Sequence, residues 1–251
     1  YTFRNFYNGA GVAIGDINQD GLPDIFLAGN QTSNRLYLNQ GNLKFKDITN
    51  DAGLNSSGIW STGVSMADVN GDGLLDIYVC KSGPKGGERR HNELFINNGD
   101  LTFSEQSEKY GLAESGLSQH AVFFDYDKDG DLDMYLLSNS GRSVGVFDLR
   151  VGQREIRDPE GGNKLFRNDG THFVDVSQEA GIYGSAIGYG LGVTVSDLNG
   201  DMWPDLYVSN DFFERDYLYL NNQDGTFKEV LPETLPEISM GSMGADIADL
   251  D

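Results

Sequence analysis

One nine-residue acidic pattern returns four times along this chain of 251 residues. Positions 1, 3, 5 and 9 of the pattern carry aspartate or asparagine, and position 6 is glycine in three of the four copies. The copies are residues 16–24, 68–76, 125–133 and 197–205, and a fifth begins at Asp249 and Asp251. Each copy holds three to five carboxylates in so short a segment that they must either repel one another or share a cation.

The pattern predicts calcium-binding loops, because Ca²⁺ takes six to eight oxygen ligands and short loops with alternating oxygen side chains supply them. We expect side-chain ligands at positions 1, 3, 5 and 9 and a backbone carbonyl ligand at position 7, with a bidentate aspartate or water completing the shell. Magnesium fits less well, because it requires a tighter octahedron and retains water. About four calcium sites are expected, and a fifth would be completed by residues beyond Asp251. The predicted ligands are Asp16, Asn18, Asp20, Leu22, Asp24, Asp68, Asn70, Asp72, Leu74, Asp76, Asp125, Asp127, Asp129, Asp131, Asp133, Asp197, Asn199, Asp201, Trp203, Asp205, Asp249 and Asp251.

A single copy could equally be an Asx-rich hairpin turn, since Asp, Asn and Gly dominate turns for reasons unrelated to metal. Four copies in register favour the metal interpretation. The fourth copy departs from the others at Met202, where they have glycine. A left-handed backbone there would strain a residue with a Cβ, so we expect this loop to bind more weakly or to adopt another turn.

Composition excludes several classes of function. Aromatic residues at 11% and charged residues at 23% are typical of a globular protein. A net charge of −21 excludes electrostatic binding to nucleic acid or to anionic membranes, and four calcium ions would reduce it to −13. No apolar run reaches the roughly 18 residues of a membrane-spanning helix, so no direct membrane insertion is expected. Cys80 is the single cysteine, which excludes an intrachain disulfide and suggests a buried residue in a strand.

The loops repeat with a period that predicts the architecture. Their first aspartates are residues 16, 68, 125, 197 and 249, so the spacings are 52, 57, 72 and 52 residues. Each unit alternates polar and apolar residues around its loop, continues with an Asn-rich third strand, and has a fourth strand starting at Phe45, Phe103, Phe173 or Phe227. Four antiparallel strands per unit predict an all-β fold, a β-propeller with four-stranded blades.

We place the repeats at about 1–55, 56–113, 114–183 and 184–236, with an incomplete fifth at 237–251, so the chain is expected to be part of a longer protein. Two units carry insertions between their second and third strands, at 82–90 and 140–162. Rim loops on a rigid scaffold are where partner surfaces usually arise, so we expect a protein or carbohydrate ligand there. The alternative is that both insertions are plain solvent-exposed loops.

The repeated motifs resemble a known family. A DxNxDGxxD loop between two strands, followed by NxLFxNxGxF, is similar to the FG-GAP/VCBS repeats of integrin α-subunit propellers. It is most similar to the repeats of cartilage-acidic-protein-like and bacterial ASPIC/UnbV-containing secreted proteins. The resemblance implies a seven- or eight-bladed propeller, calcium in the first hairpin of each blade, and an extracellular or cell-surface location after removal of a leader.

Three functions are compatible with these features. The first is a non-catalytic, calcium-stabilised scaffold that binds protein or glycan. The second is a polysaccharide-active enzyme of the lyase-like propeller type, although none of His91, His120 and His172 lies in a recognisable catalytic motif. The third is a lectin, which would use aromatic faces such as Trp60 and Trp203 for sugars. Packing between blades is the alternative role of such aromatic residues.

Overall fold

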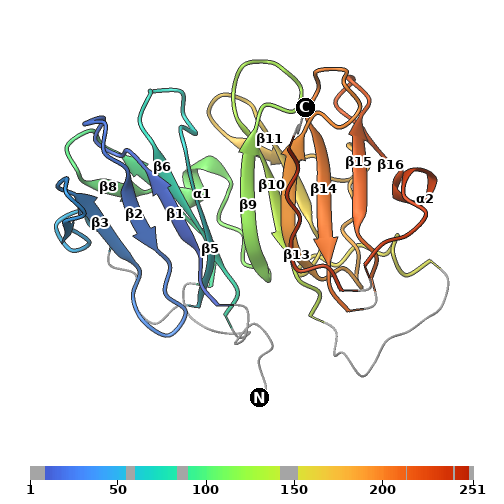
Figure 1. Cartoon of the computed structure of the whole chain (residues 1–251), viewed down its shortest axis with the longest axis horizontal. Coiled ribbons are helices and arrows are strands. Elements are labelled where there is room, and N and C mark those ends of the chain that lie inside the picture. Colours follow the sequence, from blue (N-terminus) through green and yellow to red (C-terminus); the bar gives the residue numbers. More distant parts are fainter. Residues whose placement is uncertain are drawn as a thin grey trace. The chain divides into compact units, whose positions relative to one another are not determined.

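The computed structural model describes residues 9–54, 60–83, 90–141, 152–212, 214–239 and 241–248. Within them the chain forms four separate four-stranded antiparallel sheets (Figure 1), and the strands of each sheet follow one another in sequence order. The predicted all-β fold built from four-stranded units is therefore confirmed.

The strands of the first two sheets are β1 (Val12–Gly15), β2 (Asp24–Leu27), β3 (Arg35–Asn39), β4 (Phe45–Asp47), β5 (Ser61–Ala67), β6 (Asp76–Lys81), β7 (Glu93–Asn97) and β8 (Phe103–Glu105). Those of the other two are β9 (Ser118–Phe124), β10 (Asp133–Ser138), β11 (Lys164–Asn168), β12 (Phe173–Asp175), β13 (Gly190–Ser196), β14 (Asp205–Asn210), β15 (Tyr217–Asn221) and β16 (Phe227–Glu229). Two single-turn helices, α1 (Ser107–Tyr110) and α2 (Leu231–Thr234), follow β8 and β16.

The strand boundaries agree closely with the sequence pattern. Every fourth strand begins at the expected phenylalanine, and every second strand begins at the last aspartate of an acidic loop. The alternation of polar and apolar residues begins at Gly63, Ala121 and Gly192. The strands β5, β9 and β13 start two or three residues before these positions, so β9 includes His120.

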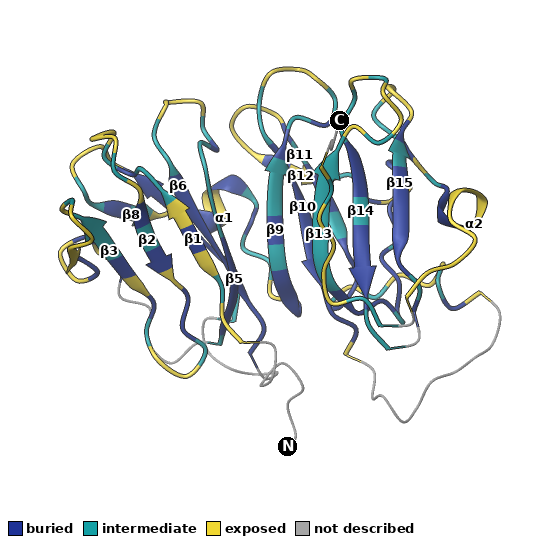
Figure 2. Cartoon of the chain, viewed as in Figure 1, coloured by how far each residue is buried: buried dark blue, intermediate teal, exposed yellow. Residues whose placement is uncertain are grey.

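The chain divides into two compact units, which are described separately. The first comprises Tyr1–Ala121 and Gly170–Phe173, and its core lies between the sheets β1–β4 and β5–β8. Phe26 and Leu36 from one sheet and Ile77 and Val79 from the other are fully buried there. Apolar side chains of the two sheets meet in this core, and Figure 2 shows the buried positions of the strands in dark blue.

The second unit comprises Val122–Asp169 and Val174–Asp251, and its core is rich in tyrosine. Tyr217 and Tyr219 of β15 are fully buried, and Tyr183 packs edge-on against Tyr217 with ring centroids 5.4 Å apart. Tyr189 packs against Phe212 at 4.7 Å. Both Tyr183 and Tyr189 therefore pack against other aromatic rings of the second unit.

Two further expectations can be compared with the described part of the chain. Cys80 is fully buried in β6, and burial raises the pKa of its thiol. None of the described helices is both long enough and apolar enough to span a bilayer.

Candidate metal centre

Each of the four acidic loops joins the first two strands of a sheet. Position 1 immediately follows the first strand, and position 9 is the first residue of β2, β6, β10 or β14. The register fixes both ends, because Gly15 pairs with Asp24 and the corresponding pairs are Ala67 with Asp76 and Ser196 with Asp205. Asp249 and Asp251, predicted for a fifth loop, lie outside the described residues.

The loops fold around the carboxylate at position 1. In the second loop, Asp68 accepts the N–H of Asp72 at 3.0 Å and the N–H of Gly73 at 2.8 Å. Asp16 and Asp197 accept the equivalent pairs of N–H groups. Positions 4 and 6 have positive φ, for example 72° at Gly71 and 88° at Gly73, so both backbone turns are left-handed.

The fourth loop adopts this turn despite its methionine. Met202 has φ 69°, and its N–H donates to Asp197 Oδ2 at 2.8 Å, as the glycines of the other loops do to their own position-1 aspartates. The expected left-handed strain is therefore present, and the alternative of a different turn is wrong. The reason is that Asp197 accepts the N–H groups of Gly200, Asp201 and Met202, and these three bonds hold the backbone in this turn.

The aspartates at position 9 brace the frame of each loop. Asp76 is buried, and its two oxygens accept the N–H of Val69 at 3.1 Å and the N–H of Asn97 at 2.8 Å. Asp24, Asp133 and Asp205 make the same two bonds. Burial, with a smaller contribution from the neighbouring loop carboxylates, raises the pKa of Asp76 to about 6 and that of Asp133 to about 7.

The last asparagine of each third strand is a site residue that the ligand pattern did not include. The N–H of Asn39, Asn97, Asn168 and Asn221 donates to the position-9 aspartate. The side-chain amide of each donates to the position-8 carbonyl of the same loop. The sequence signal was available, because this asparagine recurs at a fixed place in every NxLFxN segment.

The third loop gathers carboxylates most closely. One oxygen each of Asp125, Asp127 and Asp133 lies within 4.8 Å of the others, and among the described residues this is the one such acidic group. Asp125 Oδ1 is buried without a hydrogen-bond partner. Burial and the charge of Asp129 raise the pKa of Asp127 and raise that of Asp131 to about 6. An orphaned oxygen inside a set of like charges fits a hard divalent cation.

The other three loops replace part of that charge with an amide. Asn18 donates its Nδ2 to Asp20 Oδ2 at 3.0 Å, and Asn70 and Asn199 make the equivalent bonds at 2.9 and 3.0 Å. Their side chains thus neutralise some of the repulsion that Asp127 cannot relieve in the third loop. The position-7 N–H donates to the position-5 carboxylate in each of the four loops. The assignment of positions 1, 3, 5 and 9 as ligands stays a prediction.

A groove of about 470 Å³ lies beside the third loop, in the second unit. Its lining includes the apolar Val176 and Ala180 together with Arg167 and Gly225. The equivalent positions in the first unit are Leu38 and Leu101, which pack on the apolar core there. The second unit has Arg167 and Gly225 where the first unit has these two leucines, so the groove is open and partly polar.

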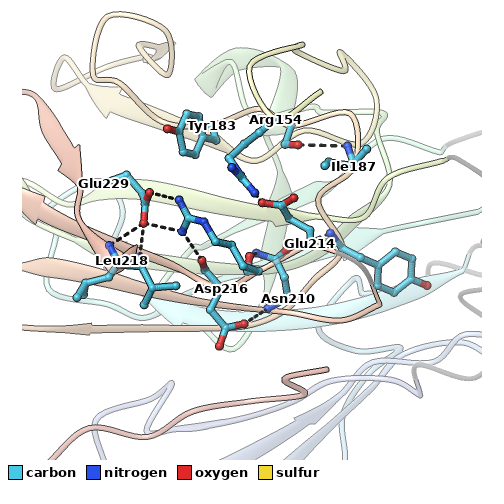
Figure 3. A network of polar contacts seen from close by, with 12 residues as sticks. Arg154, Tyr183, Ile187, Asn210, Glu214, Asp216, Leu218 and Glu229 are labelled. Atoms are coloured by element: carbon cyan, nitrogen blue, oxygen red, sulfur yellow. Dashed lines mark hydrogen bonds and ion pairs between the residues drawn. The ribbon is translucent and has the colours of Figure 1, made fainter. Parts of the chain in front are cut away.

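The insertion after β10 is fastened to the fourth sheet. Arg154 points toward Glu214, as Figure 3 shows, and donates its Nε to the buried Glu214 Oε1. Arg215, next in the chain, pairs with Glu229 of β16. Residues 142–151 of this insertion and 84–89 of the other rim loop lie outside the described residues.

Comparison with known proteins places the repeat. A model of the FG-GAP-like repeat matches residues 3–79, 85–136 and 197–251, which is well over half of the chain. The chain belongs to the FG-GAP-like repeat family. The resemblance expected from the motifs is thus confirmed, and the three matched segments include all four acidic loops.

Curated FG-GAP-like relatives include cartilage acidic protein 1 of Xenopus tropicalis, 28% identical over 213 residues, and of Homo sapiens, 27% identical over 207 residues. Each alignment covers 82% of this chain but only 29% and 28% of the relative, so the chain spans less than a third of their length. Among solved structures, an Agrocybe aegerita lectin that recognises non-reducing terminal N-acetylglucosamine aligns with 86% of this chain and 50% of its own, at 23% identity and a TM-score of 0.46.

Proposed function

We propose that this FG-GAP-like repeat protein is a non-catalytic scaffold whose acidic loops bind calcium for structural reasons and whose rim binds a protein or glycan. The observation that carries the proposal is the third loop, where Asp125, Asp127 and Asp133 converge around a buried oxygen without a partner. Burial, together with repulsion from the neighbouring loop carboxylates, raises the pKa of Asp127 and of Asp133, and a bound divalent ion would offset both effects. Calcium would stabilise the folded chain by mass action, because an unfolded chain cannot assemble the loops.

An extracellular location is part of the proposal. The curated relatives are named for cartilage and for acidity, and this chain shares the acidity with a net charge of −21. Millimolar calcium outside cells would fill even weak sites, which intracellular calcium would leave vacant.

The binding role rests on the surfaces that differ between repeats. The insertion around Arg154 is anchored by a buried carboxylate, so its described part is presented rigidly. The groove beside Arg167 and Gly225 is lined by both apolar and polar side chains, which suits a glycan or a polar side chain of a partner protein. Refilling it with Arg167→Leu and Gly225→Leu, the residue type of the first unit, should abolish ligand binding there without loss of the calcium response.

The calcium part is tested by thermal unfolding of the chain in calcium and in excess chelator, together with a metal count on purified protein. A melting temperature that rises in calcium, with about four ions per chain as the loop count predicts, supports the proposal. Absence of both metal and a shift would mean that the loops are acidic turns only.

A further inference from the structure

Hydrogen bonds join the first and second acidic loops into a pair. Ile17, at position 2 of the first loop, donates its N–H to Asp24 at 3.1 Å, and its carbonyl accepts Asn97 Nδ2 at 2.9 Å. Asn97 in turn donates its N–H to Asp76 of the second loop at 2.8 Å. The position-9 carboxylates of two successive loops are therefore connected through one backbone residue and one asparagine.

The second unit repeats this connection with different residues. Tyr126 donates its N–H to Asp133 at 3.1 Å, and its carbonyl accepts Asn221 Nδ2 at 2.8 Å. Asn221 donates its N–H to Asp205 of the fourth loop at 2.8 Å. Asn97 and Asn221 are both buried, so water cannot readily replace either bond.

The exposed side chains at position 4 add a second contact within each pair. Gln19 Nε2 donates to the carbonyl of Gly73 in the second loop at 2.8 Å. The ammonium group of Lys128 lies over the ring of Trp203 in the fourth loop, 4.7 Å from its centroid. Both units thus connect neighbouring loops at the buried base and at the exposed tip.

Asn39 supplies an internal control for these contacts. It makes the same bonds within its own sheet, to Asp24, to the Pro23 carbonyl and from the Gly41 N–H. Within the described part of the chain, its amide reaches no loop of another sheet. Asn39 therefore has the local role of Asn97 and Asn221 without the connection between loops.

The geometry points to Asn97 and Asn221 as positioning residues that couple ion binding in the two loops of each unit. This inference rests on the proposed calcium binding. An ion that orders position 2 of one loop also fixes the asparagine that holds the position-9 carboxylate of the next, so the second ion meets an ordered ligand. A single buried hydrogen bond of this kind supports a coupling of about 2- to 10-fold in affinity. By linkage, each loop strengthens the other by the same factor.

The chain carries its own reporter for the fourth loop. Trp203 occupies position 7 there, and the sequence has only two tryptophans. In a Trp60→Phe background, terbium used as a calcium analogue and excited through the indole of Trp203 reports binding at the fourth loop. Because Lys128 of the third loop lies against the same ring, terbium in the third loop is excited as well, and titrations with the third loop intact are fitted to two sites. The third loop is emptied by Asp127→Asn with Asp129→Asn, which leaves the bracing Asp133 in place. The measured quantity is the ratio of fourth-loop affinities with the third loop intact and emptied.

We expect that ratio to be about 2- to 10-fold with Asn221 present and close to one in Asn221→Ala. An unfolding curve checks that Asn221→Ala folds. If it does not, Asn221→Ser is used in its place, because its hydroxyl can still accept a hydrogen bond in the turn. Asn39→Ala, which removes the same local bonds in the other unit, should leave the ratio unchanged. A ratio of one in the parent, or an unchanged ratio in both Asn221 variants, overturns the coupling. Absence of any terbium or calcium binding in the parent overturns the calcium function itself and the coupling with it.

Discussion

Replacement of Met202 by glycine should stabilise the protein. Met202 has φ 69° with its side chain 78% exposed, so it bears the cost of a left-handed backbone while burying little apolar surface. That backbone costs an L-residue about 1–2 kcal/mol. Glycine also gives the unfolded chain more freedom, which costs about 0.4–1 kcal/mol. The difference leaves a gain of roughly 0.5–1 kcal/mol in the free energy of unfolding.

Urea denaturation in excess chelator measures this gain without any contribution from bound metal. Met202→Ala is the matched control, since it removes the exposed side chain but keeps the Cβ that causes the strain. The reverse change, Gly73→Ala, should lower the free energy of unfolding, because Gly73 has φ 88°. A Cβ there would meet no atom within 4 Å, so the loss would come from backbone strain and not from a steric clash. If Met202→Gly destabilises the protein, or if Met202→Ala gains as much, the strain argument is refuted.

Three further outcomes are expected. Asp72→Ala should lower the melting temperature in calcium but little in chelator. Asp76→Ala should lower the free energy of unfolding by roughly 2–5 kcal/mol in both conditions, because two buried N–H groups lose their acceptor. Equal behaviour of the two variants would contradict the division between ligand and brace. Because Asp131 and Asp133 have folded-state pKa values raised to about 6 and about 7, the stability they contribute to the metal-free protein is full below about pH 4 and is lost as pH rises to about 7. Asp131→Asn should flatten that loss in urea titrations at several pH values, and an unchanged slope would count against it. Cys80 should react with a thiol reagent only after unfolding, and rapid labelling of the native chain would contradict its burial.

The fold was predictable because its signals are local. Loop positions, strand starts at Phe45 or Phe103, and the hairpin turns each depend on residues within one repeat, and the repetition made every signal visible four times. The boundaries of β5 and β9 were less accurate, because strand pairing extends both strands to residues before the first alternating residue. Tertiary pairing, rather than intrinsic propensity, decides those ends.

The connections between loops could not be predicted from the repeat alone. Asn97 and Ile17 are 80 residues apart in the sequence, and Asn221 and Tyr126 are 95 apart. The motif places an asparagine at the end of every third strand, but its amide has two possible acceptors, and only the packing of one sheet on the next brings the second within reach. The same motif residue is thus local at Asn39 and connecting at Asn97.

The two roles of the position-9 aspartates explain why the loops keep one shape. Asp76 uses one lone pair of each oxygen for a backbone N–H, and each oxygen retains a second lone pair that a cation can use. The frame is therefore set by bonds that persist without metal. In the metal-free protein, burial in this frame disfavours the charged form of the carboxyl groups and so raises the pKa of Asp76 and Asp133. Calcium would then bind a loop whose fold is already set, so the ordering it adds is confined to the residual motion of position 2 and of the ligand carboxylates, and most of its binding energy would go into stability.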